Sequence, residues 1–241
     1  MIEQIDTDLF LEELYEKFNF KSDFLFKGLD PDERRYFGDQ MEQLIFRKHD
    51  LLYYEGGIPT GVYYLIDGKV KKYKDAFGSE KQILYIYRQG DLLGYHALLS
   101  GERHGDSCEA MEECVVGFIS ADTFNAMINA IPSLRMSVIK NLSHEFGVLS
   151  NTISLQAQKS QKVRLAVFLL ILERRFNPSM MPDQGIEISR DNLANIAGTS
   201  RESLGRTLKE FKENGFIRVR RRKIYISDQE SLIELIYNAM H

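Results

Sequence analysis

Charged residues that could read DNA bases are gathered in the stretch SRESLGRTLKEF, which begins at Ser200. Arg201, Glu202 and Arg206 surround Gly205, a small residue inside a predicted helix. An arginine can donate two hydrogen bonds to guanine O6 and N7, and a glutamate can accept one from cytosine N4. Gly205 would let the backbone approach a duplex closely. The same charges could also be solvated on the outer face of an ordinary surface helix.

A pair of short helices joined by a glycine turn is predicted to hold these side chains. Ser189 suits the N-cap of the first helix, Gly198 suits the turn, and the second helix is expected to begin near Thr199 or Ser200. Successive residues of a helix are 100° apart around its axis. The apolar residues of the second helix then fall within an arc of about 60°, which would face inward. Arg201, Glu202, Gly205, Arg206 and Lys209 fall within a separate arc of about 140°, which would face outward. The inward-facing apolar positions of the two helices are Leu193, Ile196, Ala197, Leu204, Leu208 and Phe211. This spacing predicts a helix-turn-helix.

A basic hairpin is predicted directly after the second helix. The stretch FIRVRRRKIYIS indicates two short strands that enclose Arg220, Arg221 and Arg222. Such a hairpin could reach phosphates beside a helix that lies in the major groove. Helix, turn, helix and basic wing together favour DNA binding over a merely solvated helix.

The charge distribution also favours a polyanionic partner for the C-terminal third of the chain. From Lys162 onward 14 Lys and Arg oppose 10 Asp and Glu, whereas 17 oppose 25 before it, and the whole chain of 241 residues carries −4. Basic residues that neutralise phosphates release condensed counterions. No apolar run reaches the roughly 18 residues of a membrane span, and the acidic N-terminus is unlike a secretory signal, so we expect a cytoplasmic protein.

The first 130 residues are predicted to be rich in β-strands. After an amphipathic N-terminal helix, short apolar runs such as LLYYEGG, GVYYLIDGKVKKY and CVVGFIS recur between glycines. Strands with Gly and Asp turns indicate an antiparallel sandwich or barrel, and Gly68 is expected to form a hairpin turn. Cys108 and Cys114 are too few for a disulfide framework or a four-thiolate site, and we expect both to be buried as small apolar residues.

A longer helix is predicted from Ser133, where the apolar spacing changes to that of a coiled-coil seam of about two heptads. The seam residues, spaced three and four apart in alternation, are Ile139, Leu142, Phe146, Leu149 and Ile153. We expect two copies of the chain to pair there. A helix packed on its own β-domain is the alternative. The polar stretch QAQKSQK that follows is the expected hinge.

The stretch ISRDNLANIAGTSRESLGRTLKEFKENGFI resembles the DNA-binding signature of the Crp/Fnr family, named for the cyclic-AMP receptor protein and the fumarate and nitrate reduction regulator. GVYYLIDGKVKKY is similar to the β-roll of that family, and GDLLGYHALL to its ligand cassette. The resemblance implies an α+β fold with a cyclic-nucleotide-binding-like β-roll (an antiparallel jelly roll), a long dimerisation helix and a C-terminal winged helix-turn-helix. The expected domains are residues 1–22 as a helical extension, 23–132 as the sensor, 133–158 as the dimerisation helix and 159–241 as the DNA-binding domain.

The resemblance also implies a function, because members of the family are homodimeric transcription regulators. RESLGR is similar to the cyclic-AMP receptor type, so we expect an inverted-repeat operator with TGTGA-like half-sites. Arg201, Glu202 and Arg206 would read bases. Phosphate contacts would come from Ser189, Ser200, Ser203, Arg220, Arg221 and Arg222. The implied partners are double-stranded DNA, a second copy of the chain, RNA polymerase and a small-molecule effector.

The ligand cassette departs from the family pattern. Nucleotide-binding members have a Glu after the cassette glycine and an Arg-Ser pair near its end, where this chain has Tyr95, His104 and Gly105. Arg103 is adjacent and could substitute after a loop shift, but its acidic neighbours disfavour an anion site. We therefore expect an unidentified effector in place of cyclic AMP. The expected effector pocket comprises Tyr95, His96, Arg103, His104 and Ser107.

Two alternatives stay open at this point, a haem- or redox-sensing regulator of the same fold and a dimeric sensor scaffold that binds no DNA. An iron–sulfur sensor is not expected, because no cysteine precedes Cys108. A haem sensor of the same fold would need an axial ligand, for which the candidates are His49, His96, His104 and Met111. An enzyme is not expected, because the chain has no close His pair, phosphate loop or nucleophile motif.

Overall fold

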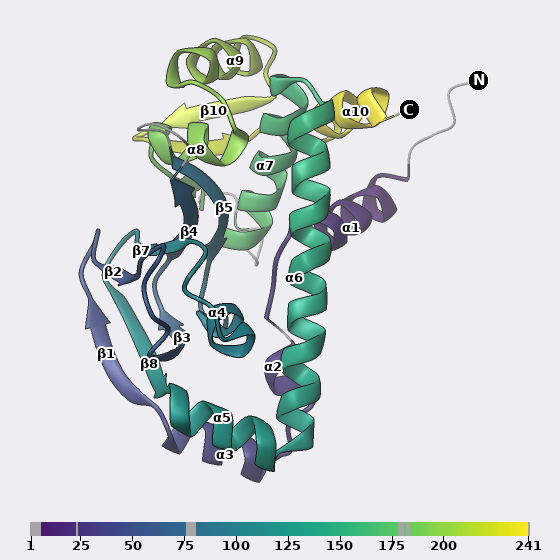
Figure 1. The fold of residues 1–241 in the computed structure, drawn as a ribbon. Coiled ribbons are helices and arrows are strands. Elements are labelled where there is room, and N and C mark those ends of the chain that lie inside the picture. Colours follow the sequence, from purple (N-terminus) through teal and green to yellow (C-terminus); the bar gives the residue numbers. More distant parts are fainter. Residues whose placement is uncertain (1–5, 23, 76–80, 178–180, 182–183, 241) are drawn as a thin grey trace. The chain divides into compact units, whose positions relative to one another are not determined.

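The chain folds into two compact units, which Figure 1 shows as a ribbon. The computed structural model describes residues 6–22, 24–75, 81–177, 181 and 184–240. One unit runs from Phe20 to Phe146 and is called the sensor unit after the role that its sequence predicts. The C-terminal unit combines the segment up to Asn19 with the chain from Gly147 onward. One long helix, α6 (Pro132–Gln158), contributes to both units. No helix in the described ranges is long and apolar enough to cross a membrane.

The sensor unit is built on two four-stranded sheets with antiparallel pairing throughout, which agrees with the predicted β-roll. The first sheet has the order β1 (Glu42–Phe46), β8 (Cys114–Ser120), β3 (Gly61–Asp67) and β6 (Leu92–Leu93). The second has the order β2 (Leu51–Tyr53), β7 (Ser107–Ala110), β4 (Val70–Asp75) and β5 (Lys81–Tyr87).

The turn at Gly68 differs from the predicted hairpin. Its φ of +95° is in the left-handed region, where glycine is favoured. However, β3 and β4 belong to different sheets, so the turn carries the chain from one sheet to the other. A Cβ atom at Gly68 would lie only 2.7 Å from the Cys114 sulfur, which explains why the sheet corner needs a glycine.

Short helices complete the sensor unit. They are α2 (Phe24–Lys27), α3 (Pro31–Asp39), α4 (Tyr95–Ser100) and α5 (Ala121–Ala130). A capping box between Asp30 and Glu33 starts α3. Side chains from these helices, from the first sheet and from α6 form one hydrophobic core, whose fully buried members include Leu25, Phe37, Val62, Leu92, Tyr95, Ile119, Phe124 and Leu134. This core seats α4, which carries part of the stretch that resembles the ligand cassette, against the sheet.

The C-terminal unit has the element order of a winged helix. Its elements after α6 are α7 (Gln161–Phe176), β9 (Ile186–Glu187), α8 (Arg190–Ala197), α9 (Arg201–Glu213), β10 (Ile217–Arg220), β11 (Lys223–Ile226) and α10 (Gln229–Met240). The strands form an antiparallel sheet of order β10-β11-β9. Helix α7 is buried along most of its length and forms the centre of the unit.

The N-terminal helix α1 (Thr7–Phe18) packs in this C-terminal unit. The Phe10 ring lies edge-on to Tyr237 of α10, with centroids 5.8 Å apart. The guanidinium of Arg174 from α7 lies 4.7 Å from the ring centroid of Tyr15. An amphipathic helix is stable when its apolar stripe is covered, and α7 and α10 cover this one.

The compact units therefore divide the chain differently from the expected domains. Residues 1–22 were expected as a separate extension, but α1 joins the C-terminal unit, and residues 1–5 lie outside the described part of the chain. The unit boundary at residues 146 and 147 lies inside α6, whereas the sequence placed boundaries at its two ends. A continuous helix shows no break in its sequence pattern where its contacts change.

Candidate DNA interface and sensor cavity

N-caps and a left-handed turn fix the helix-turn-helix. Ser189 Oγ accepts a hydrogen bond from the N–H of Asn192 at 3.1 Å, and Ser200 Oγ accepts one from the N–H of Ser203 at 3.1 Å. Gly198 ends α8 with φ of +61°, a conformation that favours glycine. All six predicted apolar positions are buried. The predicted helix-turn-helix is confirmed, and two of the expected phosphate-contacting serines also cap its helices.

The charged residues of α9 lie on its exposed face. Arg201 Nη1 is 3.2 Å from Asp191 Oδ1, and Arg206 Nη1 is 3.5 Å from Glu202 Oε1. Both arginine side chains are 72% exposed. Exposed ion pairs contribute about 1 kcal/mol or less, so a nucleic acid can readily displace them. The fold thus brings the three predicted base-reading residues onto one accessible surface.

Gly205 has no packing role inside the protein that would require a glycine. A Cβ atom placed there would meet no described atom within 4 Å. A glycine in a helix interior is destabilising by roughly 0.5–1 kcal/mol relative to alanine. Gly205 therefore weakens the helix although no neighbour inside the protein requires a glycine there. Its missing side chain instead leaves room for an external partner to approach the helix closely.

The wing is a tight hairpin with two arginines at its tip. Arg221 and Arg222 join β10 to β11 and have φ values of +48° and +69°. A two-residue turn with two positive φ angles fits the twist of a hairpin but normally favours Asn-Gly. A residue other than glycine in this region costs about 1 kcal/mol or more. The hairpin therefore tolerates backbone strain and presents two cations next to the exposed Arg220.

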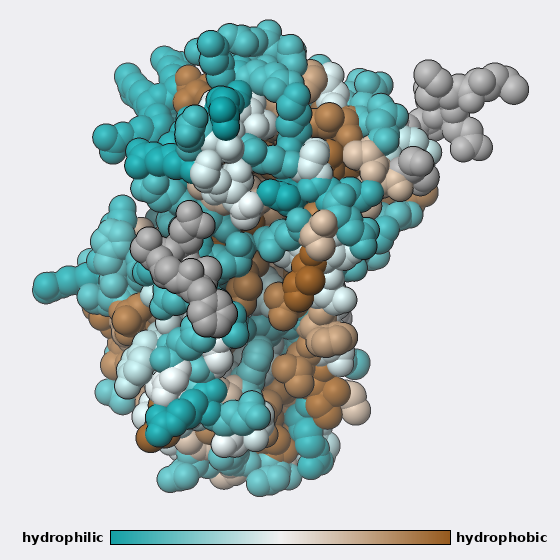
Figure 2. Space-filling model, turned by 45° about the horizontal axis from the view of Figure 1, so that its top comes forward, coloured by the Kyte–Doolittle hydropathy of each residue, from teal (hydrophilic) through white to brown (hydrophobic). Residues whose placement is uncertain are grey.

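An exposed apolar stripe follows α6. Its exposed members are Met136, Ile139, Leu142, Phe146 and Ile153, and Leu149 is half-buried. The Phe146 side chain is the most accessible of them, since the residue is 74% exposed. Figure 2 shows hydrophobic side chains along this helix. Contiguous exposed apolar side chains mark interaction surfaces. The predicted seam is accessible, and Met136 extends it by one residue that the prediction omitted.

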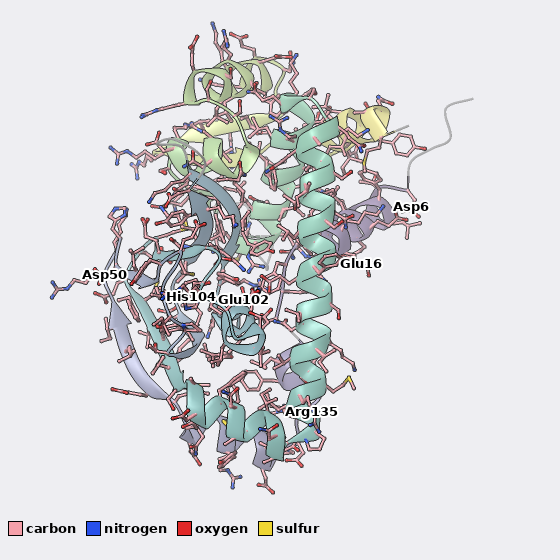
Figure 3. All side chains as sticks on the ribbon, viewed as in Figure 1. Asp6, Glu16, Asp50, Glu102, His104 and Arg135 are labelled. Atoms are coloured by element: carbon pink, nitrogen blue, oxygen red, sulfur yellow. The ribbon has the colours of Figure 1, made fainter. Side chains whose placement is uncertain are left out.

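A cavity of about 460 Å³ opens in the sensor unit beside α4. Three of the five predicted pocket residues, His96, Arg103 and His104, line it. The His104 ring stacks on Tyr53 with centroids 4.1 Å apart. Glu102, which is labelled with His104 in Figure 3, also lines the cavity. Sites for small molecules commonly have volumes of about 300–1,000 Å³, so a ligand of that size class fits.

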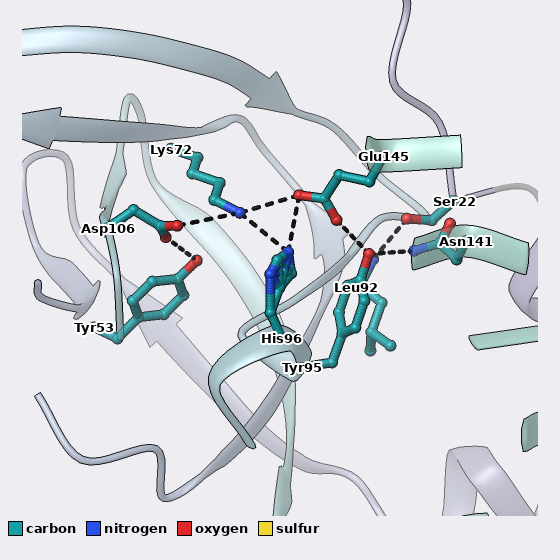
Figure 4. A network of polar contacts seen from close by, with 9 residues as sticks. All are labelled: Ser22, Tyr53, Lys72, Leu92, Tyr95, His96, Asp106, Asn141 and Glu145. Carbon is teal, nitrogen blue, oxygen red and sulfur yellow. Dashed lines mark hydrogen bonds and ion pairs between the residues drawn. The ribbon is translucent and has the colours of Figure 1, made fainter. Parts of the chain in front are cut away.

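The other two predicted pocket residues do not line this cavity. Tyr95 is fully buried, and its hydroxyl group lies among side chains of α6, as Figure 4 shows. Ser107 Oγ accepts a hydrogen bond from the backbone N–H of Glu55 at 2.9 Å. These two residues support neighbouring segments of the sensor unit.

A buried polar network joins the cavity wall to α6 (Figure 4). Lys72 Nζ lies 3.2 Å from Asp106 Oδ2 and 3.0 Å from Glu145 Oε1. His96 Nε2 lies 3.2 Å from the same oxygen of Glu145. The Tyr95 hydroxyl donates a short hydrogen bond to Glu145 Oε2. All five side chains belong to the sensor unit.

Burial and neighbouring charges set the charge states in this network. Burial lowers the pKa of Lys72, but Glu145 and Asp106 outweigh that effect and hold the pKa above its ordinary value. Burial and the Lys72 charge lower the pKa of His96, against the opposing effect of the two carboxylates. Burial also lowers the pKa of His104. At neutral pH, Lys72 is therefore charged and both histidines are neutral.

Sequence reasoning missed Lys72, Asp106 and Glu145 as candidate site residues. Lys72 follows another lysine in a strand, and Glu145 precedes Phe146 of the predicted seam, so both are typical of solvated charges in the sequence. One signal was present: Val138, Asn141 and Glu145 recur at helical spacing on a second face, which lies about 90° around the helix from the centre of the seam. A carboxylate on a second, buried helix face indicates a buried cationic partner.

Cysteine and histidine side chains near the β-roll have ordinary structural partners. Cys108 and Cys114 are buried free thiols, as predicted, and burial raises the pKa of both. His49 Nδ1 lies 2.9 Å from Glu109 Oε1. In the part of the chain that the structure describes, no group of three His, Cys, Asp or Glu side chains could hold a metal ion.

Two families match the two parts of the chain. Residues 43–130 match the family described as cyclic nucleotide-binding domain, and residues 163–235 match the family described as Crp-like helix-turn-helix domain. The fumarate and nitrate reduction regulatory protein of Escherichia coli (strain K12) is 28% identical over 204 residues, which cover 82% of this chain and 81% of that protein. The anaerobic regulatory protein of Haemophilus influenzae is 27% identical over 204 residues, which cover 82% of this chain and 79% of that protein.

Solved structures share the fold. The c-di-GMP responsive global regulator CLP of Xanthomonas campestris has a TM-score of 0.73 at 20% identity, covering 82% of this chain and 99% of that chain. FixK2 of Bradyrhizobium japonicum has a TM-score of 0.73 at 21% identity, and the match covers 81% of this chain and 96% of that chain. A cyclic-nucleotide-binding-like domain is thus followed by a winged helix-turn-helix with an exposed arginine surface, and the curated relatives are regulators. The chain belongs to the Crp/Fnr family of DNA-binding transcriptional regulators.

Proposed function

We propose that this regulator binds an inverted-repeat operator as a homodimer, with α9 of each copy in the major groove. The exposed surface formed by Arg201, Glu202 and Arg206 around Gly205 is the observation that carries this proposal. Two arginines and a glutamate there match the donors and acceptors of G·C pairs. Half-sites resembling TGTGA, with centres about one helical turn apart or slightly more, fit this surface and a two-fold dimer.

Binding to labelled duplexes at several salt concentrations tests the base-reading assignment. Arg201→Ala and Glu202→Ala should each lose roughly 1–3 kcal/mol of discrimination at one base pair. Arg221→Ala should weaken binding to all sequences alike and flatten the salt dependence. An unchanged sequence preference in Arg201→Ala would assign base reading to other residues. A wild-type protein without salt-dependent DNA binding would instead support the scaffold alternative.

A second copy of α6 is the proposed partner of the exposed stripe on that helix. Ile139, Phe146 and Ile153 recur at seven-residue spacing and are exposed, as a coiled-coil seam requires. Pairing would bury this apolar surface and align two winged helices with the two half-sites. We also propose that the bound dimer changes transcription by contacting RNA polymerase. We propose no catalytic activity for this chain.

We propose that the sensor cavity takes a small-molecule effector other than cyclic AMP. Tyr95 and His104 stand where nucleotide-binding relatives have ribose and phosphate ligands, and the Tyr95 hydroxyl is bonded to Glu145. Arg103 Nη1 donates a 2.8 Å hydrogen bond to the Gly56 carbonyl. Calorimetry with cyclic AMP and cyclic GMP should show no binding. Micromolar binding abolished by Arg103→Ala would show that a shifted loop forms a phosphate site.

Neither haem nor an iron–sulfur cluster is part of the proposal. His96 Nε2 contacts Glu145, and His49 Nδ1 contacts Glu109, so these candidate axial ligands already have carboxylate partners. The thiols of Cys108 and Cys114 are buried. Absorption spectra and native mass measurement of the purified protein test this point, and a Soret band or an added cofactor mass would contradict it.

A further inference from the structure

The ammonium of Lys72 is the buried cation of the sensor cavity. Its side chain is 5% exposed and lines the cavity together with His96 and Asp106. Lys72 Nζ contacts Glu145 Oε1 at 3.0 Å, Asp106 Oδ2 at 3.2 Å and His96 Nε2 at 3.4 Å. An ammonium has three N–H donors, and the two carboxylates accept two of them. The Nε2 of the neutral His96 cannot accept the third while it donates to Glu145.

Hydrogen-bond donors of the sensor unit surround both oxygens of the Glu145 carboxylate. Its side chain extends from α6 and is 4% exposed. One oxygen faces Lys72 and His96, and the other accepts the hydrogen bond of the Tyr95 hydroxyl. That hydroxyl is itself held by Asn141 Nδ2 at 2.8 Å. A cation, a ring nitrogen and a hydroxyl would also bind the anionic group of a small ligand.

The charge of the cavity disfavours an additional anion. The charged side chains that line it are Lys72, Glu102, Arg103 and Asp106, and Glu145 adds a third carboxylate to the two cations. His96 and His104 are neutral at pH 7, because their pKa values are lowered. A second anion would therefore meet an excess of negative charge and a lysine that is already paired with two carboxylates. Burying an unpaired charge is strongly unfavourable.

We propose that Glu145 acts as a resident anionic ligand of the sensor cavity, so that the cavity rejects anionic effectors and accepts neutral or cationic ones. This inference rests on the proposed function in treating the cavity as the effector site. The same carboxylate connects the cavity wall to α6 within the sensor unit, without any bound effector. Removing it should convert the cavity into a site for exogenous carboxylates.

Chemical rescue of Glu145→Ala tests the proposal. This variant leaves the donors of Lys72, His96 and Tyr95 around an empty space of carboxylate size. Sodium formate should raise its melting temperature by several degrees above sodium chloride at equal ionic strength, because a ligand that binds the folded state stabilises it. Wild-type protein should respond equally to the two salts. Glu102→Ala, which removes an exposed cavity carboxylate, is the matched control and should behave like wild type.

Two outcomes would overturn the proposal. One is a formate response of wild type as large as that of Glu145→Ala, and the other is a folded Glu145→Ala variant without any formate response. If this variant does not fold, Glu145→Ser leaves most of the same space and keeps a small polar side chain. Calorimetry with sodium formate should then detect binding to Glu145→Ser and none to wild type, and the reverse pattern or no difference refutes the idea. Wild-type DNA binding is measured separately, so its absence would contradict the proposed function alone.

Discussion

The guanidinium of Arg164 donates a 2.9 Å hydrogen bond from Nη2 to the carbonyl of Gly198, in the turn between α8 and α9. Its Nε donates to the Ala197 carbonyl at 2.9 Å, and its Nη1 contacts the Gln156 and Lys159 carbonyls at 3.3 and 3.0 Å. These carbonyls lie at the C-terminal ends of α8 and α6, which carry partial negative charge. One side chain therefore caps two helices and joins the end of α6 to the helix-turn-helix.

Arg164→Ala should loosen the helix-turn-helix. Four carbonyls lose a charged donor, and we expect about 2–3 kcal/mol of destabilisation. We also expect at least a tenfold loss of operator affinity, because α9 would no longer be held at one angle to α6. Urea unfolding measures the first effect, and fluorescence anisotropy with labelled operator measures the second.

Arg164→Lys separates charge from geometry in this prediction. Lysine retains the positive charge at the two helix ends but lacks the planar fork that reaches several carbonyls. We expect stability between those of wild type and Arg164→Ala, with most of the operator affinity still lost. Wild-type affinity in either variant, measured where the protein is folded, would remove Arg164 from DNA recognition.

Gly205→Ala should raise stability and lower DNA affinity together. Alanine favours the helix by roughly 0.5–1 kcal/mol, and a Cβ atom there meets no described atom within 4 Å. The same Cβ would stand between the arginine surface and the duplex. Gly147→Ala in α6 is the matched control, since its Cβ is equally unobstructed. That control should gain stability and keep its operator affinity, and equal affinities of both variants would contradict the prediction.

The DNA-binding part of the molecule could be predicted closely from the sequence. Ser189, Gly198 and Ser200 have local roles as caps and turn, which depend on neighbouring residues and so are visible in the sequence. The apolar residues of α9 follow a helical period, and their burial agrees with it. Local signals of this kind determine where a helix begins, where it ends and which of its faces is buried.

The sensor network could not be predicted in this way. Lys72 and Glu145 are 73 residues apart, and nothing local distinguishes them from solvated charges. The hairpin expected at Gly68 was wrong for the same reason, because sheet membership depends on distant strands. Tyr95 was expected in the pocket wall from its place in the cassette, but α4 directs its hydroxyl towards α6.

Replacing the wing tip Arg221-Arg222 by Asn-Gly should separate fold from function. Asn-Gly suits a turn with two positive φ angles, so we expect a gain of about 1 kcal/mol or more. Loss of two cations that are expected to contact phosphates should weaken binding to all duplexes and reduce the slope of log K against log salt by about 2. Binding titrations from low to high salt measure the slope. An unchanged slope would show that the wing tip does not touch DNA.

Acidification should destabilise the sensor unit through its histidines. Burial and the Lys72 charge lower the pKa of folded His96, against Glu145 and Asp106, so the unfolded chain binds protons first as the pH falls. The stabilising effect is fully present above the unfolded value of about 6.5 and declines below it, towards the folded pKa. His96→Gln should show a smaller decline in unfolding free energy between pH 7.5 and about 5, measured with urea. A decline parallel to that of wild type would contradict this role.

Phe146→Asp should produce monomers. The residue is 74% exposed at the centre of the stripe on α6, so the substitution should leave the fold of one copy intact. In a paired seam it would bury two unpaired carboxylates, which is strongly unfavourable. Sedimentation equilibrium measures the mass, and monomers should bind the operator poorly because each half-site is then bound alone. Ile45→Asp on β1, a similarly exposed apolar position elsewhere, should stay dimeric, and a dimeric Phe146→Asp would place the interface on another surface.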